Sequence, residues 1–156
     1  GIYNMGNTCY MNSAMQCLAN IRLFNHYYVD QEIHKSQINR NNVLGYKGKR
    51  VGAFASIISQ MWNSKQVLVP KGFSTSCRAS TRTLEDLQQD TVEYLNFILD
   101  GLHEDTNMRV EKPYIENPDS RDRDMIELAL ESWSNSLSRD WSFAFFMFYG
   151  QMKSTL

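Results

Sequence analysis

The chain has 156 residues, of which 42% are apolar and 12% aromatic, a composition that supports one folded domain with a core and excludes a disordered chain. Its formal net charge of −1 gives no reason to expect nucleic acid or an anionic membrane as a partner. No stretch is long and apolar enough to cross a bilayer, no signal peptide is visible, and three cysteines suit a reducing compartment rather than a disulfide framework.

The first predicted element is a helix from about Cys9 to Asn20, preceded by a tight, irregular turn that glycine and asparagine favour. Thr8 is expected to cap this helix, which puts Cys9 in the first turn. There, free backbone amides and the positive end of the helix dipole favour a thiolate. The same amides, together with the side-chain amide of Asn4, can hold a developing oxyanion. Most cysteines near a helix are instead small, inert, buried residues.

The run from Gly1 to Ser13, with its unbroken Gly-Asn-Thr-Cys-Tyr-Met-Asn-Ser, closely resembles the cysteine box of the ubiquitin-specific proteases. Ile2 and Met5 stand where leucine is commoner in that family, which is a conservative change. The resemblance implies that Cys9 is the catalytic nucleophile. It also implies that Asn4, five positions earlier, helps to stabilise the oxyanion.

Residues 25–50 carry no recognisable site. His26 and His34 lack metal-ligand spacing with the cysteines, so we expect them to be ordinary surface or packing residues. Residues 39–50 are polar and punctuated by glycine, which predicts a loop.

A core helix is predicted next. Apolar residues recur at helical spacing from Val51 to Trp62, a stripe typical of a core-facing helix rather than of a cofactor site. Residues 67–73 are expected to be a short extended or turn segment, and residues 74–83 a mobile loop. Cys77 lies in that loop without a neighbouring base, and no role is expected for it.

The strongest predicted helix carries an apolar face from Leu84 to Leu102, over about five turns. Gln88-Gln89-Asp90, followed by Glu93-Tyr94-Leu95, resembles the second signature of the same family. The resemblance implies that Gln88 and Asp90 bind the basic C-terminal tail of ubiquitin. A carboxylate can pair with an arginine, and a glutamine can hold an extended backbone through its donor and acceptor. Without the resemblance, the same residues suit a solvated helix face with a capping aspartate.

His103 is the obvious candidate for a general base, but its position argues against that role. It lies roughly 20 Å along the helix from the Gln-Gln-Asp turn, whereas a hydrogen bond reaches only about 3 Å. In the resembling signature this histidine is structural.

Beyond residues 107–121, a charged connection, the sequence predicts a helix over 122–137. Its inward-facing residues are expected to be Ile126, Leu130, Trp133 and Leu137. The aromatic density of residues 141–154 favours a strand with both faces buried. The family resemblance continues there at Ser142, Phe148, Gly150, Gln151 and Ser154, although Phe146 replaces an expected acid.

The resemblance implies an α+β, papain-like cysteine protease fold. Residues 1–156 would cover mainly its helical thumb, with 141–156 beginning the strand that leads to the fingers. The family's Cys-x-x-Cys zinc pair, its later histidine box and the Asn or Asp that orients that histidine are not in the sequence. We therefore expect a cut piece that holds no metal or other cofactor, has an open strand edge, and is inactive or nearly inactive alone.

The implied function is that of a deubiquitinase. A thiol attacks the isopeptide or ester carbonyl after the terminal glycine of ubiquitin, and water hydrolyses the acyl-enzyme. The expected partners are ubiquitin and ubiquitinated proteins, with no nucleic acid and no membrane insertion, in the cytoplasm. Similarity around 45–48 and 100–103 points to the branch associated with endosomal sorting, and so to endosomes. The alternatives are a catalytically dead, ubiquitin-binding or regulatory truncated form, and a generic helical domain with a coincidental cysteine.

Overall fold

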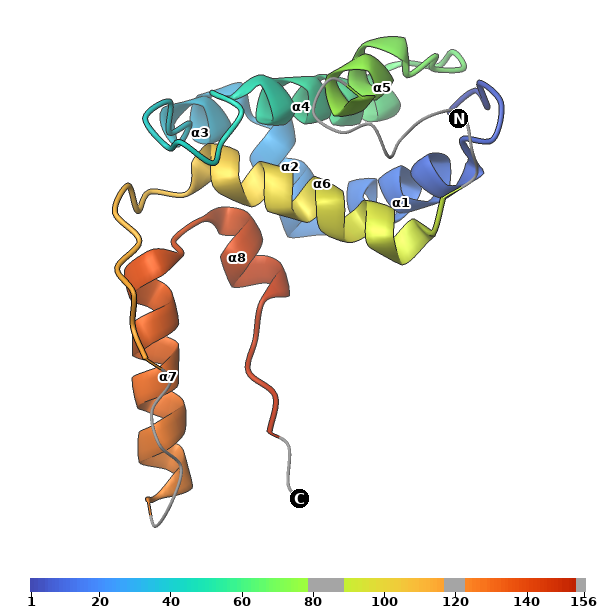
Figure 1. Cartoon of the computed structure of the whole chain (residues 1–156). Helices are drawn as coiled ribbons and strands as arrows, with labels where there is room; N and C mark the ends of the chain where they lie inside the picture. Colours follow the sequence, from blue (N-terminus) through green and yellow to red (C-terminus); the bar gives the residue numbers. More distant parts are fainter. Residues whose placement is uncertain (79–88, 117–122, 154–156) are drawn as a thin grey trace.

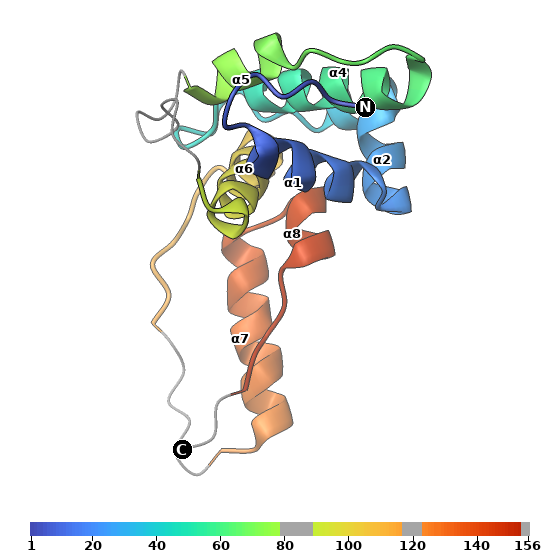
Figure 2. The ribbon, with the colours of Figure 1, turned by 90° about the vertical axis from the view of Figure 1, so that its right-hand side faces the viewer.

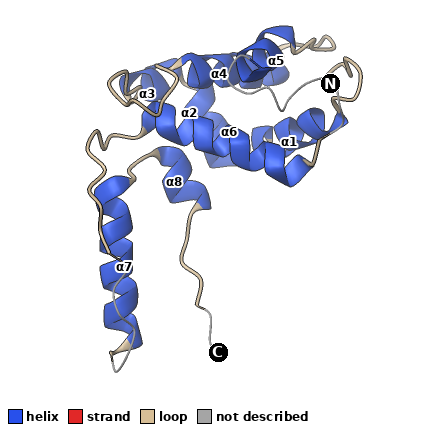
Figure 3. Cartoon of the chain, in the orientation of Figure 1, coloured by secondary structure: helices blue, strands red, loops and turns tan. Residues whose placement is uncertain are grey.

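The computed structural model describes residues 1–78, 89–116 and 123–153, and all regular secondary structure in these ranges is helical (Figure 3). The described helices are α1 Cys9–Ala19, α2 Arg22–Val29, α3 Gln31–Ser36, α4 Lys49–Asn63, α5 Lys71–Arg78, α6 Thr91–Thr106, α7 Met125–Arg139 and α8 Phe143–Phe148. One isolated parallel β-bridge joins Ile2 to Leu68. No helix in the described ranges is both long and apolar enough to cross a membrane.

A helical body forms the centre of the molecule, built from α1, α2, α4 and α6 packed against one another (Figure 1). Its fully buried side chains include Met15, Leu18, Phe24, Phe54, Ile58, Ile98 and Leu102. All of these residues except Phe24 come from predicted apolar stripes, and both α1 and α4 are confirmed to within two residues. Phe24 lies in α2, a helix that was not predicted from the sequence. The hydrophobic core therefore fixes the position of α1, whose first residue is Cys9.

The start of α4 depends on a residue from α6. Gly48 occupies the N-cap position, and because glycine has no side chain it cannot cap the helix. Its φ of +82° and the 2.7 Å distance that a Cβ would have to Ile38 both require glycine there. Instead the buried Asp105 accepts hydrogen bonds from the backbone N–H groups of Arg50 (2.9 Å) and Val51 (3.1 Å). The predicted loop over 39–50 is confirmed as far as Gly48, and α4 begins one residue later.

Helix α5 corrects the prediction for the segment after residue 67. The bridge at Leu68 agrees with a short extended segment, but a helix begins at Lys71 and continues through residues expected to be a loop. Phe73 and Cys77, four residues apart, are both buried and lie on the face toward the core. Two apolar residues at this spacing were too weak a pattern to indicate a helix within a polar stretch.

Helix α6 begins at Thr91 rather than near Leu84, and residues 79–88 lie outside the described ranges. Ile98 and Leu102 are fully buried as predicted. Val92, expected on the same apolar face, is 64% exposed.

The prediction for α7 is right about the helix and partly wrong about its packing. Trp133 and Leu137 are half-buried, and Trp133 stacks on Phe145 of α8 with ring centroids 5.4 Å apart. The helix runs over Met125–Arg139, but none of its side chains, all of them in the described ranges, is buried. Ile126 and Leu130, expected to face inward, are 72% and 66% exposed. Both views show α7 directed away from the helical body (Figures 1 and 2). Amphipathic periodicity predicted the apolar face but not whether anything covers it.

The predicted strand over 141–154 is wrong where the structure describes it, because α8 occupies Phe143–Phe148. Ser142 caps this helix by accepting a hydrogen bond from the backbone N–H of Phe145 at 3.1 Å. Phe143 stacks on Tyr27 of α2, with ring centroids 4.1 Å apart. A short apolar run with two buried faces is compatible with helix or strand, and here a cap and an aromatic partner decide for the helix.

Candidate active site

The loop before α1 is held together by the side chain of Asn4. Its Oδ1 accepts hydrogen bonds from the backbone N–H groups of Gly6 (3.1 Å) and Thr8 (3.2 Å) and from the Thr8 hydroxyl (3.0 Å). Gly6 and Asn7 both have positive φ, which produces the tight turn that the sequence predicts. Because three donors point at one atom of the amide, that atom must be the oxygen. The Asn4 Nδ2 group makes no hydrogen bond to any described residue.

Thr8 stands at the N-cap position of α1 but does not cap the helix with its side chain, which corrects the prediction. Its hydroxyl accepts instead from the backbone N–H of Met5, at 3.1 Å, and donates to Asn4. By contrast, Asp90 and Asp124 cap α6 and α7 through their carboxylates. The first backbone amides of α1 therefore have no side-chain cap within the described residues, and they surround Cys9.

Cys9 is the first residue of α1 and is exposed. Its backbone carbonyl accepts a hydrogen bond from the Ser13 hydroxyl at 2.9 Å, while Thr8 and Tyr10 on either side are buried. The thiol therefore lies at the start of a helix and is open to solvent.

The start of α6 lies beside the start of α1. Tyr10, next to Cys9, packs edge-on against Tyr94 with ring centroids 5.1 Å apart. Asp90 precedes Tyr94 by one helical turn, and both views show the first turns of α1 and α6 at the same end of the helical body (Figures 1 and 2). The structure thus brings Cys9, Asn4 and Asp90 to one region. The Tyr10–Tyr94 pair that joins the two helices has no periodic signal in the sequence.

Asp90 is exposed and caps α6, as the alternative interpretation of the sequence has it. Its Oδ1 accepts hydrogen bonds from the backbone N–H groups of Val92 (2.7 Å) and Glu93 (3.0 Å). The second carboxylate oxygen makes no hydrogen bond to a described residue, and Asp90 as a whole is exposed. Gln88, the other predicted binding residue, lies outside the described residues.

The other two cysteines differ from Cys9 in their surroundings. Cys77 is buried, and its sulfur is 4.0 Å from the hydroxyl of Tyr94. Burial raises the pKa of the Cys77 thiol, which keeps it protonated and unreactive. Cys17 is exposed but lies two turns along α1, away from the uncapped amides.

No histidine lies at Cys9, and all three histidines of the chain are within the described ranges. His103 is buried near the far end of α6, where its ring nitrogens contact the Ser142 hydroxyl (2.7 Å) and the Asp140 carboxylate (3.2 Å). These bonds tie α6 to the segment before α8, which confirms that His103 is structural.

The family model and the similar proteins of known name all indicate the same family. The family model described as "Ubiquitin carboxyl-terminal hydrolase" matches residues 1–156. The chain is 43% identical over 158 aligned residues to ubiquitin carboxyl-terminal hydrolase 4 of Mus musculus, and 40% identical to ubiquitin carboxyl-terminal hydrolase 15 of Homo sapiens. Each alignment covers 100% of the chain and 16% of the relative. The chain thus spans about a sixth of the length of these curated relatives.

Proposed function

Because the chain belongs to the ubiquitin carboxyl-terminal hydrolase family, we propose that it supplies the nucleophile half of a deubiquitinase of the ubiquitin-specific protease type. The reaction is hydrolysis of the isopeptide or ester bond that follows the C-terminal glycine of ubiquitin. The observation that carries the proposal is the exposed thiol of Cys9 at the uncapped start of α1, beside the start of α6.

In the proposed reaction the Cys9 thiolate attacks the carbonyl carbon of the terminal glycine of ubiquitin, and the π electron pair of the C=O bond moves to oxygen. The oxyanion accepts hydrogen bonds from first-turn amides of α1 and from Asn4 Nδ2. This role for Asn4 is supported by the three bonds to its Oδ1, which orient the side chain while its NH₂ group makes no hydrogen bond to a described residue. The intermediate collapses, the leaving amine or alkoxide takes up a proton, and water hydrolyses the thioester.

Substrate recognition in this proposal uses the second carboxylate oxygen of Asp90 and the side chain of Gln88. The carboxylate pairs with an arginine of the ubiquitin tail in a charge-assisted hydrogen bond. The exposed position of Asp90 near the start of α1 supports this assignment, since a tail bound there leads toward Cys9.

The 156 residues alone are proposed to be inactive or nearly so. A cysteine protease needs a base to take the thiol proton and an acid to protonate the leaving group, and a lost acid–base group costs about 10² to 10⁴ in rate. His103 is occupied near the far end of α6, and no hydrogen bond joins any histidine to Cys9 among the described residues. The same observation keeps a second candidate open, a ubiquitin-binding or regulatory form that does not turn over substrate.

The test uses ubiquitin that carries an electrophile at its C-terminus, with the adduct followed by intact-mass spectrometry. We expect the full polypeptide encoded by the gene to form one covalent adduct, and the 156-residue chain to react at least about 10²-fold more slowly. The adduct should disappear in Cys9→Ala and persist in Cys17→Ala, a matched exposed cysteine on the same helix.

Two outcomes would contradict the proposal. An adduct that survives Cys9→Ala would place the nucleophile elsewhere. A full polypeptide that binds ubiquitin in calorimetry but forms no adduct would establish the binding or regulatory form.

A further inference from the structure

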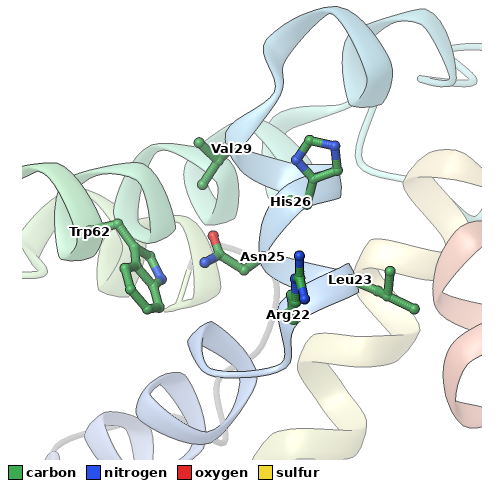
Figure 4. A pocket seen from close by; sticks show the side chains of 6 residues that line it. All are labelled: Arg22, Leu23, Asn25, His26, Val29 and Trp62. Atoms are coloured by element: carbon green, nitrogen blue, oxygen red, sulfur yellow. The ribbon is translucent and has the colours of Figure 1, made fainter.

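A hollow separate from the Cys9 region lies between α2 and the end of α4. It has a volume of about 600 Å³ and is lined by Arg22, Leu23, Asn25, His26, Val29 and Trp62 (Figure 4). Trp62 donates a hydrogen bond from its indole Nε1 to the backbone carbonyl of Ala19, the last residue of α1, at 3.0 Å. Cys9 is ten residues earlier, which is about 15 Å along the helix. The hollow therefore does not belong to the proposed active site.

Two large apolar side chains stand exposed in this hollow. Leu23 is 64% exposed and Trp62 is 55% exposed. The hydrogen bond to Ala19 holds the indole in place, so its exposure does not result from a loose side chain. Trp62 and Leu23 lie on opposite sides of the hollow, with Asn25 and Arg22 between them (Figure 4). Exposed, large apolar side chains at a hollow are typical of the anchor region in a protein-binding surface.

The charge around these apolar residues is positive. Arg22 lines the hollow, and Lys65 follows Trp62 by three residues. The nearest acid in sequence is Asp30, whose Oδ1 accepts hydrogen bonds from two backbone amides at the start of α3. Helices α2 and α4 themselves carry no Asp or Glu, and Asp30 follows Val29, the last residue of α2.

This local charge is part of a segregation along the whole chain. Residues 1–84 contain ten Lys and Arg but only Asp30 and Glu32 as acids, whereas residues 85–156 contain six Lys and Arg against fifteen acids. The net charge of −1 conceals two halves of opposite sign. The residues that line the hollow belong to the basic half of the sequence, and a surplus of cations favours an acidic partner.

We propose that the hollow between α2 and α4 binds an acidic peptide segment of another protein, with one apolar side chain seated between Leu23 and Trp62. Carboxylates that flank this anchor pair with Arg22 and Lys65. The inference does not rest on the catalytic proposal, because it uses none of the same residues.

A peptide fits this surface better than a nucleic acid or an anionic membrane does. The hollow is a confined pocket with apolar side chains on its rim and one lining Arg or Lys, Arg22, whereas nucleic-acid affinity comes mainly from many phosphate contacts along a basic track. Membrane binding requires a broad apolar face or a dense basic cluster.

The test selects peptides from a displayed library of random 12-residue sequences on the full chain. We expect enrichment of sequences with several Asp or Glu around one Trp, Phe or Leu. The affinity of an enriched peptide, measured by fluorescence anisotropy, should fall about tenfold or more in Arg22→Glu, because the substitution reverses the charge of an exposed residue that lines the hollow. Leu23→Ser should weaken the same peptide by about fivefold, as expected for loss of an apolar contact.

Two matched variants separate a local site from a general charge effect. Lys71→Glu makes the same charge change at the first residue of another helix, α5, and Val67→Ser removes an apolar side chain that is 65% exposed. Both should leave the affinity within twofold. A glutamate is favourable at a helix start, so both charge variants should fold, which their melting temperatures will check.

The proposal is overturned if no sequence is enriched, or if the enriched peptides are basic or uncharged. Equal losses in Arg22→Glu and Lys71→Glu would also overturn it. So would binding of labelled RNA or phosphatidylserine vesicles that Arg22→Glu abolishes, without any peptide binding.

Discussion

At the scale of single residues, the orientation of one amide gives the site its sharpest prediction. The Asn4 Oδ1 atom organises the loop through three accepted hydrogen bonds, and the Nδ2 group is the proposed oxyanion donor. Asn4→Asp keeps the acceptor but removes the donor and adds negative charge where the oxyanion forms. In the full polypeptide we expect kcat for a ubiquitin ester or amide to fall by about 10² to 10³. The melting temperature should change little.

Asn4→Ala serves as the comparison for this prediction. It removes both the donor and the loop contacts, so it should lower kcat and also the melting temperature. If Asn4→Asp retains most of the activity, the amide is structural only.

Asp90 combines two functions that a substitution can separate. Asparagine caps helices as well as aspartate does, so Asp90→Asn should keep α6 stable while removing the charge proposed to bind the ubiquitin tail. We expect ubiquitin affinity, measured by calorimetry, to fall about tenfold, as for the loss of a charge-assisted bond. The melting temperature should hardly change.

The matched control is Asp124→Asn at the start of α7, where Oδ1 accepts hydrogen bonds from the backbone N–H groups of Ile126 and Glu127 in the same way. This variant should leave ubiquitin affinity unchanged. Equal effects of the two substitutions would mean that Asp90 acts only as a cap.

At the scale of helices, the buried end of α3 should make stability depend on pH. His34 is 2% exposed, and its Nδ1 donates a hydrogen bond to the Asp30 carbonyl at 2.9 Å. Burial lowers the pKa of His34 below its ordinary value of 6.5. As the pH falls below about 6.5, the unfolded chain takes up the proton first, so the free energy of unfolding falls toward acid pH.

Urea titrations at several pH values between 7.5 and 5.5 can measure this effect. His34→Gln should flatten the profile, by at most about 1.4 kcal/mol per pH unit for one proton. His26→Gln, which replaces an exposed histidine, should show the same slope of unfolding free energy against pH as the wild-type chain. A slope that persists in His34→Gln would assign the pH dependence to other groups.

At the scale of the whole molecule, α7 is the element that the body does not cover. Its apolar residues Met125, Ile126 and Leu130 are all more than half exposed. A hollow of about 560 Å³ lies between them and the segment around Gly150. This face, rather than the open strand edge expected from the sequence, is the apolar surface through which the chain should self-associate.

The double variant Ile126→Ser/Leu130→Ser should therefore reduce self-association in sedimentation experiments on the 156-residue chain. Its stability should stay within about 0.5 kcal/mol of the wild type for each exposed position. Ile98→Ser on α6 is the buried counterpart and should cost at least about 2 kcal/mol. A loss of more than 2 kcal/mol in the double variant would show that α7 packs on the body in solution.

The sequence alone determined the family, the helices with strong apolar periodicity and the position of Cys9 at a helix start. These features are local, because residues close together in the sequence define both a motif and an apolar stripe at helical spacing. The assignment to the endosomal-sorting branch and the binding roles of Gln88 and Asp90 stay predictions.

Only the tertiary structure decided which faces are covered and which distant residues meet. It made the aromatic segment near Phe145 a helix, left α7 exposed, brought Tyr10 against Tyr94, and placed Asp105 at the start of α4. It also showed that the Thr8 hydroxyl does not cap α1 but donates a hydrogen bond to Asn4. Each outcome depends on partners supplied by packing between segments far apart in the chain, and periodicity along the sequence does not encode that information.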